Sequence, residues 1–244
     1  MNMAEGWSER LDQMEEWYRE LLAGGDAEAR DSLDNDYRPH REFLGRLGGR
    51  VLDVGGGAGL AARFLSPDCD HCVIDPSAVW EEPNWAEFAG RYRAHRPVEF
   101  VKGTGEDLPF SDASFDAVLA LWTLNHARDP GRCMREIARV ARPGAPALVV
   151  LEDMVPTWSD IMRFTAKRLA NRFGGRFPDA QWGQPEVATL AQTWRVRIAG
   201  RWPLQWDHLR IREAEFKRSV ERDFEITSRR WRGGSLTFEL VRKT

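Results

Sequence analysis

The sequence of 244 residues is poor in cysteine, tyrosine and lysine, and it has no long hydrophobic run. Its 3 cysteines are too few for a disulfide framework, which indicates a reducing compartment. The longest apolar stretch, 145–151, is far shorter than a membrane span. The first residues have neither the basic region nor the apolar region of a signal peptide. We therefore expect a cytoplasmic protein with no membrane partner.

A strong charge of either sign is also missing. The formal net charge is −3, whereas a general nucleic-acid binder would carry a basic field, so we expect no nucleic-acid partner. Hydrophobic residues make up 42% of the chain and charged residues 30%, which is typical of a globular protein with one large domain, or with a domain and an insertion. Arginine far outnumbers lysine among the 35 basic residues, which hints at a GC-rich bacterial genome.

Two of the cysteines, Cys69 and Cys72, match the C-x-x-C spacing of a zinc ligand pair. A zinc site needs two further ligands at suitable spacing, and the sequence has neither a second C-x-x-C nor a histidine pair. Cys72 also opens an apolar run that is typical of a strand. We expect small buried side chains here and no bound metal.

Strand and helix patterns alternate along most of the chain. Helical spacing covers 7–23, and a second helical stretch begins near Pro39. Further short helices are expected at 60–65, 83–93, 130–141 and 212–222. Strands are expected at 51–54, 72–75, 98–102, 115–121, 147–151, 224–231 and 236–241, the last two joined at Gly233-Gly234.

This alternation predicts an α/β fold: a Rossmann-like sheet of seven strands, mostly parallel, closed by an antiparallel hairpin. Residues 1–49 form an N-terminal helical cap, and 50–151 with 207–244 form the core. Residues 152–206 interrupt the pattern and are expected to be a helical insertion that serves as a lid. Parallel sheets of this kind bind ligands at the carboxyl ends of their strands.

A glycine-rich turn follows the first strand. One acidic residue, Asp53, comes just before the glycines, and another, Asp75, ends the second strand. The segment DVGGGAG at 53–59 has the spacing G-x-G-x-G, which differs from the dinucleotide fingerprint because Leu60 replaces its third glycine. A pyrophosphate avoids a neighbouring carboxylate, so Asp53 suits a cationic amino-acid group instead. Asp75, at the end of the second strand, is placed to accept both hydroxyls of a ribose.

Five ordered motifs together give a family resemblance. They are VLDVGGGAG at 51–59, VIDPS at 73–77, EDLPFSDASFDAV at 106–118, LNHARDP at 124–130 and EIARVARPG at 136–144. On these motifs the chain resembles class I S-adenosylmethionine-dependent methyltransferases, in the small-molecule branch with the ubiquinone and menaquinone biosynthesis enzymes. The resemblance is strong over 50–151 and weak over 208–244.

The resemblance implies a cofactor site for S-adenosylmethionine, with S-adenosylhomocysteine as the product. The expected cofactor-binding residues are Asp53, Gly55, Gly57, Gly59, Asp75, Pro76, Ser77, Thr104, Gly105, Glu106 and Leu121. In the family an Asp usually follows the third strand and binds the adenine amino group. Here Thr104 and Gly105 stand in that region, so adenine recognition is expected to depend on the Gly105 backbone and on Glu106.

The methyl acceptor and any general base are less defined. Candidates for the base are His126, Glu152 and Asp153, although Asp153 could equally cap the next helix. Tyr37 and Arg38, with His40, lie where N-terminal lid residues contact cofactor or substrate in the family.

Tryptophan is abundant, with 11 residues, and most lie outside the cofactor motifs. Trp122 follows the fourth strand, and the insertion holds Trp158, Trp182, Trp194, Trp202 and Trp206. We expect Trp122 and Trp158 to line a lidded pocket for a small aromatic or apolar acceptor. Packing alone explains any single one of these residues equally well.

Three alternatives remain open. First, a protein of this fold could use the bound sulfonium cofactor for chemistry other than methyl transfer, or serve as a binding partner. A macromolecule-modifying enzyme is disfavoured because LWTL at 121–124 replaces the acceptor motif of that class. The third alternative is a NAD-dependent oxidoreductase, which NADH binding would distinguish from a methyltransferase. The sequence leaves open whether O, N or C is methylated, and whether the protein is a monomer or a homodimer.

Overall fold

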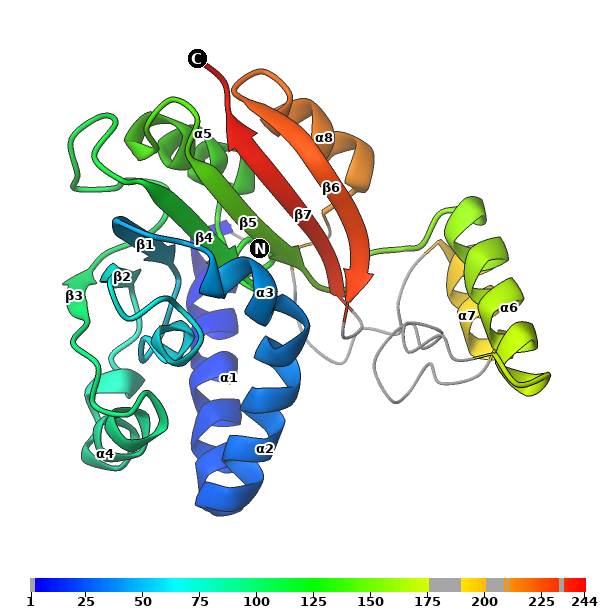
Figure 1. The fold of residues 1–244 in the computed structure, drawn as a ribbon. Helices are drawn as coiled ribbons and strands as arrows, with labels where there is room; N and C mark the ends of the chain where they lie inside the picture. Colours follow the sequence, from blue (N-terminus) through cyan, green and yellow to red (C-terminus); the bar gives the residue numbers. More distant parts are fainter. Residues whose placement is uncertain (1–2, 176–189, 201–208, 210, 233–234) are drawn as a thin grey trace.

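The computed structural model describes residues 3–175, 190–200, 209, 211–232 and 235–244. Its centre is one sheet in the order β3-β2-β1-β4-β5-β7-β6. The strands are β1 (Arg50–Val54), β2 (Asp70–Asp75), β3 (Glu99–Lys102), β4 (Ala117–Leu121), β5 (Pro146–Leu151), β6 (Phe224–Arg232) and β7 (Ser235–Arg242). All seven expected strands are confirmed, and Figure 1 shows the last two as the closing hairpin at one edge.

The sheet reverses its winding direction between β1 and β4. β1 to β5 pair in parallel, whereas β7 runs antiparallel to both β5 and β6. The chain adds β2 and β3 on one side of β1, then returns to add β4 and β5 on the other side. This return creates a crevice at the carboxyl ends of β1 and β4, where open α/β sheets bind their ligands.

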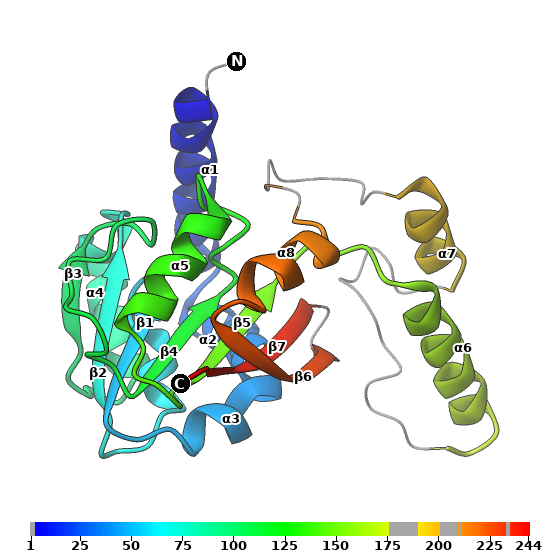
Figure 2. The ribbon, with the colours of Figure 1, turned by 90° about the horizontal axis from the view of Figure 1, so that it is seen from above.

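Helices cover both faces of the sheet because its strands are apolar on both sides. Along β1, Leu52 and Val54 belong to one buried cluster and Val51 to another. The first cluster includes α5 (Pro130–Val140) and α8 (Glu213–Val220), and the second includes α2 (Asp26–Tyr37), α3 (Arg41–Gly45) and α4 (Pro83–Tyr92). Figures 1 and 2 show this layered arrangement. Asp129 caps the start of α5, because its side chain accepts a hydrogen bond from the amide of Arg132 at 2.9 Å.

The N-terminal region differs from the prediction in one helix. The first helix, α1 (Met3–Ala23), is confirmed, and a short η1 (Arg38–His40) precedes α3. Between them, α2 was missed because its exposed side is highly polar. Its buried residues Ala29, Leu33 and Tyr37 nevertheless repeat every four positions, the spacing of one helix face. The short helix expected at 60–65 is a 3₁₀ turn, η2 (Leu60–Arg63).

The described part of the 152–206 segment contains two helices, α6 (Trp158–Arg172) and α7 (Leu190–Ala199). Figures 1 and 2 show this pair standing away from the sheet. A capping box between Thr157 and Asp160 starts α6. Arg229 of β6 forms ion pairs with Asp160 of α6 and with Glu213 of α8. The base of the helical pair is therefore fixed to the sheet and to α8 by buried charges. Trp182, Trp202 and Trp206 lie outside the described residues.

In the part of the chain that the structure describes, no helix combines the length and the apolar character needed to cross a membrane. The same residues contain no group of three or more His, Cys, Asp and Glu side chains placed to hold a metal ion. Cys69 and Cys72 are free thiols, and Cys72 is buried in the sheet.

Candidate cofactor and acceptor site

The glycine-rich turn after β1 requires glycine for conformational reasons. Gly55, Gly57 and Gly59 all have positive φ, at 66°, 54° and 70°. A Cβ on Gly55 would lie 2.3 Å from Thr123, and one on Gly57 would lie 2.8 Å from the Trp80 ring. The turn therefore approaches the end of β4 and the Trp80 ring more closely than any side chain would permit.

Asp75, at the end of β2, faces this turn and is held by three donors. The Gly57 amide donates to its Oδ2 at 2.9 Å, while the Ser77 amide and the Trp80 indole donate to its Oδ1 at 2.9 and 3.0 Å. Burial is the main influence on this carboxyl group and raises its pKa, which the three hydrogen bonds partly oppose. The carboxylate is thus fixed in orientation at the rim of the glycine turn.

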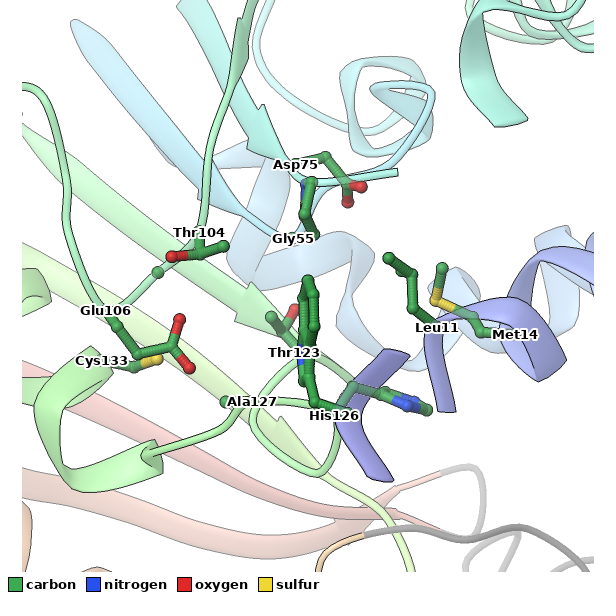
Figure 3. Close-up of a pocket in the computed structure, with 13 residues that line it drawn as sticks. Leu11, Met14, Gly55, Asp75, Thr104, Glu106, Thr123, His126, Ala127 and Cys133 are labelled. Carbon is green, nitrogen blue, oxygen red and sulfur yellow. The ribbon is translucent and has the colours of Figure 1, made fainter. Parts of the chain in front are cut away.

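A pocket opens at this edge of the sheet, shown in Figure 3. It holds about 580 Å³ of atom-free space, a volume that includes the open solvent at its mouth. The lining residues come from the ends of β1, β2 and β4, from the segment after β3, from α5 and from α1: Trp7, Leu11, Met14, Gly55, Asp75, Pro76, Thr104, Gly105, Glu106, Thr123, His126, Ala127 and Cys133. The structure thus brings seven of the predicted site residues together in one cavity.

The contribution of α1 was missed by sequence reasoning. Trp7, Leu11 and Met14 were assigned to a helix, but not to the pocket that they line. The only signal was their shared helix face, which would serve equally well for packing on a core. Arg128 lies over the Trp7 ring at 3.8 Å, and Ser77 donates to Glu15 at 2.5 Å, so α1 is attached beside the pocket at two points.

The segment after β3 carries the departure from the family pattern. Thr104, Gly105 and Glu106 all line the pocket. Glu106 also accepts hydrogen bonds from the amides of Arg128 and Asp129, at 2.7 and 3.2 Å. One oxygen of this carboxylate therefore stabilises the loop before α5.

Asp53 has a different position from the residues that line the pocket. It lies beneath the turn, where a Cβ on Gly56 would come within 2.5 Å of its carboxyl carbon. Only 1% of Asp53 is exposed, and its Oδ2 is 3.5 Å from Nε2 of the buried His71. Neither carboxylate oxygen of Asp53 has a hydrogen-bond partner among the described residues. A buried carboxylate in this state is costly, so a donor reaching it would be strongly favoured.

Two further predicted cofactor residues, Ser77 and Leu121, are buried and do not line the pocket. Ser77 is 5% exposed, and its hydroxyl bonds Glu15 and the amide of Val79. Leu121 is 6% exposed and belongs to the core cluster of the α2 face. Gly59 packs against Val98 and starts η2.

Trp122 connects the end of β4 to the N-terminal helices. Its backbone has a φ of 58°, which is rare for a bulky residue and marks a strained position. Its ring packs edge to face on Tyr37 at 5.3 Å and against His40 at 5.8 Å, and its indole donates to Ser235 at 3.3 Å. Two of the predicted substrate residues, Trp122 and Tyr37, are therefore in contact with each other.

The three candidate bases surround the ends of β4 and β5. Asn125 pairs with both backbone groups of Glu152, at 3.0 and 3.1 Å, and so fixes the chain at the end of β5. Asp153 has a φ of 51°, the second strained position at this edge. It does not cap α6, because Thr157 is the cap. His126 lines the pocket beside α1, as Figure 3 shows.

The remaining predicted substrate residues are not gathered with these. Arg38 is exposed on the surface of η1. Trp158 is 49% exposed at the start of α6, and its described ring contacts are with Trp194 and Arg197 of α7.

Comparison with known proteins agrees with this geometry. Residues 52–149 match the family described as "Methyltransferase domain". The chain is 37% identical over 101 residues to the uncharacterized methyltransferase YcgJ of Bacillus subtilis, covering 41% of this chain and 40% of that protein. It is 34% identical over 114 residues to the ubiquinone/menaquinone biosynthesis C-methyltransferase UbiE of Rubrivivax gelatinosus, covering 46% and 43%. The chain thus spans about two fifths of the length of these relatives.

The fold extends further than the sequence similarity. The crystal structure of the PH0226 protein from Pyrococcus horikoshii matches 94% of this chain and 99% of that protein, with a TM-score of 0.57 and 18% identity. Over residues 52–149 the chain is similar to methyltransferase domains, and it resembles class I S-adenosylmethionine-dependent methyltransferases of the UbiE type.

Proposed function

We propose that this protein transfers a methyl group from S-adenosylmethionine to an O, N or C atom of a small aromatic or apolar molecule. The observation that carries the proposal is the pocket at the reversal of the sheet, where the glycine turn, Asp75 and the Thr104–Glu106 segment converge. A place in the biosynthesis of a bacterial natural product fits this chemistry.

The residues present fit the cofactor. The glycine turn leaves room for the methionine part, and Asp75 is oriented at the rim to accept from the ribose hydroxyls. The buried Asp53 carboxylate attracts an amino group placed over the turn, directly or through water. Thr104 and Gly105 form the wall for the adenine. When bound, the cofactor supplies a methyl group on a positively charged sulfur, which is already activated for transfer.

The protein then has to align the acceptor and exclude water. Trp122, Tyr37 and His40 form aromatic contacts at the end of β4, next to the pocket. Leu11 and Met14 of α1 add apolar surface. These walls support a small aromatic or apolar acceptor, and we propose that α6 and α7 form the lid of the site.

Isothermal titration calorimetry with S-adenosylhomocysteine and with NADH tests the cofactor directly. We expect heat from the thioether and none from NADH, and the reverse result would overturn the proposal. Incubation with S-adenosylmethionine and an acceptor panel, followed by mass spectrometry, tests the transfer. Tight thioether binding with no methylated product would instead favour the alternative: a protein of this fold with other chemistry, or a binding partner.

A further inference from the structure

Large apolar side chains on the surface of this protein are concentrated on the α6–α7 pair, which stands away from the sheet in Figures 1 and 2. Among the described residues six such side chains are exposed, and five of the six lie on this pair or at the C-terminal cap of α6. Those five are Trp158, Met162, Leu169, Phe173 and Ile198, with exposed fractions between 49% and 81%. Single exposed apolar residues are normal on a protein surface, whereas such a concentration marks an interaction surface.

The apolar residues of α6 lie on its outer side. Trp158, Met162, Leu169 and Phe173, here called the outer stripe, are spaced by four, seven and four positions, which places them on one side of a helix. The opposite side is buried: it carries Ile161 and Phe164, and the Phe164 ring contacts Trp231 of β6 at 6.4 Å. α6 is therefore apolar on two opposite sides, of which only the inner one packs on the sheet.

Basic side chains border the outer stripe. α6 carries four of them and α7 two: Arg163, Lys167, Arg168, Arg172, Arg195 and Arg197. At about 3.6 residues per turn, Arg163 and Arg172 lie on opposite flanks of the stripe. Both are exposed, as is Arg195 of α7, and none of the three forms an ion pair with a described residue.

The charge of the two helices differs in sign from that of the whole chain. The formal net charge of the chain is −3, whereas the two helices have a single acidic residue, Asp160. Asp160 is 1% exposed and is paired with Arg229, so it does not offset the basic side chains at the surface. The surface of the pair is therefore both apolar and cationic.

Trp158 joins the outer stripe to α7. Its ring contacts the Trp194 ring at 5.6 Å, and the Arg197 guanidinium lies over it at 4.8 Å. A half-exposed indole beside a cation combines an apolar body with a polar rim, the combination that is enriched where proteins meet the interface of a membrane.

We propose that the α6–α7 pair binds the surface of a lipid bilayer that contains anionic lipids, with the outer stripe placed among the headgroups. A helix that presents Trp, Phe and Leu between basic residues has the composition of an interfacial helix. The arginines attract the lipid phosphates, and the apolar side chains leave water. A second copy of the chain fits less well, because a symmetric contact would bring two cationic surfaces together.

This binding is peripheral and does not depend on the proposed function. The helix would lie in the plane of the surface, in agreement with the absence of a membrane-spanning helix among the described residues. The sequence-based expectation of no membrane partner rested on the lack of a span, which a surface helix does not need. Because the outer stripe is opposite the side that packs on the sheet, binding leaves the inner side of the pair unchanged.

Flotation of the full chain with lipid vesicles tests the proposal. The probes are vesicles of phosphatidylcholine alone, and vesicles of phosphatidylcholine and phosphatidylglycerol in equal amounts. We expect at least about tenfold tighter binding to the mixed vesicles at low salt, since each exposed arginine contributes about fivefold. Added salt should weaken this binding.

Two pairs of variants locate the binding surface. Met162→Gln combined with Leu169→Gln should bind the mixed vesicles at least about tenfold more weakly, because two apolar side chains no longer leave water. The matched control is Phe100→Gln, which removes the sixth exposed apolar side chain, on β3, and should bind as the wild type does.

The second pair of variants tests the charge. Arg163→Gln combined with Arg172→Gln should lose about tenfold or more in affinity for the mixed vesicles and nothing for the neutral ones. Arg41→Gln combined with Arg132→Gln, two exposed arginines of α3 and α5, should match the wild type. Circular dichroism should show the wild-type melting curve for every variant, because all the substituted side chains are exposed.

Four results would overturn the proposal. They are no flotation with either vesicle, equal flotation with both, wild-type binding by the Met162→Gln, Leu169→Gln variant, and an equal loss in Phe100→Gln. Light scattering covers the competing occupant. A dimer of the free wild type that the same double variant abolishes, without vesicle binding, would assign the outer stripe to self-association instead.

Discussion

Trp122 and Tyr37 pack edge to face, with ring centroids 5.3 Å apart, and so attach the end of β4 to the last turn of α2. The contact places a residue with a strained backbone, at the end of β4, against an N-terminal helix. It therefore links the sheet to the N-terminal helices.

A double-mutant cycle measures this contact. Combining Tyr37→Leu with Trp122→Leu should reveal a coupling free energy of about 1 kcal/mol, the usual value for an aromatic pair beyond its buried area. Urea unfolding of the four proteins gives the number. As a control, Tyr37→Leu combined with Trp158→Leu should show coupling below about 0.3 kcal/mol, because Trp158 contacts α7 instead. Equal coupling in both cycles would contradict the arrangement.

The glycine turn should not tolerate a methyl group at Gly57. Its φ is 54°, and a Cβ would lie 2.8 Å from Trp80, whose indole holds Asp75. We expect Gly57→Ala to weaken S-adenosylhomocysteine binding at least about tenfold, corresponding to about 1.4 kcal/mol by calorimetry.

Gly144 provides the matched control for that variant. It also has positive φ, at 81°, but a Cβ there would meet nothing within 4 Å. Gly144→Ala should therefore cost about 1–2 kcal/mol of folding stability and leave thioether affinity unchanged. If both variants lose affinity equally, backbone strain rather than closeness to the site is responsible.

Asp75→Asn tests the fixed carboxylate. An amide can present only one oxygen, so one of the donors from Gly57, Ser77 and Trp80 would face an NH₂ group. We expect thioether affinity to fall by about 10–100-fold, or about 1.4–2.7 kcal/mol. Asp70→Asn, at the exposed start of the same strand, should bind normally. Unchanged affinity in Asp75→Asn would exclude Asp75 as the ribose ligand.

The Asp160–Arg229 pair should stabilise the fold in a pH-dependent manner. Burial alone would raise the pKa of Asp160, but hydrogen bonds from Arg229 and Thr157 lower it from 3.8 to about 2. A depressed carboxyl pKa contributes stability above the unfolded value, and this is lost as pH falls from about 4 to about 2.

Asp160→Asn should therefore lower the free energy of unfolding by about 2–4 kcal/mol at neutral pH, measured in urea. The wild type and the variant should converge near the acid end of this range. A difference that does not depend on pH would mean that packing, and not charge, accounts for the loss.

Asp36→Asn should change stability in the opposite direction. Burial raises the pKa of Asp36 from 3.8 to about 6, so its ionised form opposes folding above that pH. The penalty is absent below the unfolded value and is complete above the folded one. We expect the variant to have a higher Tm than the wild type at about pH 8 and an equal Tm at about pH 4. A lower Tm at about pH 8 would show that Asp36 has a stabilising partner.

The sequence by itself determined the sheet and the cofactor motifs. Short apolar strands, glycines at 55, 57 and 59 and the Asp129 cap are local patterns, and the structure contains the elements that they predict. Seven of the predicted site residues line one pocket because the ends of parallel strands meet at one edge.

Only the tertiary structure decided which other groups surround that edge. Nothing in a local pattern distinguishes Trp7 or Met14 facing a pocket from the same residues facing a core. Tyr18 and Trp80 are far apart in the sequence, yet their rings pack edge to face at 4.4 Å in the folded chain. Periodicity reports which side of a helix is buried, whereas the partner of that side depends on how distant segments pack. The tertiary structure therefore decided which helices border the pocket, whereas the sequence determined the strands and the glycine turn at its edge.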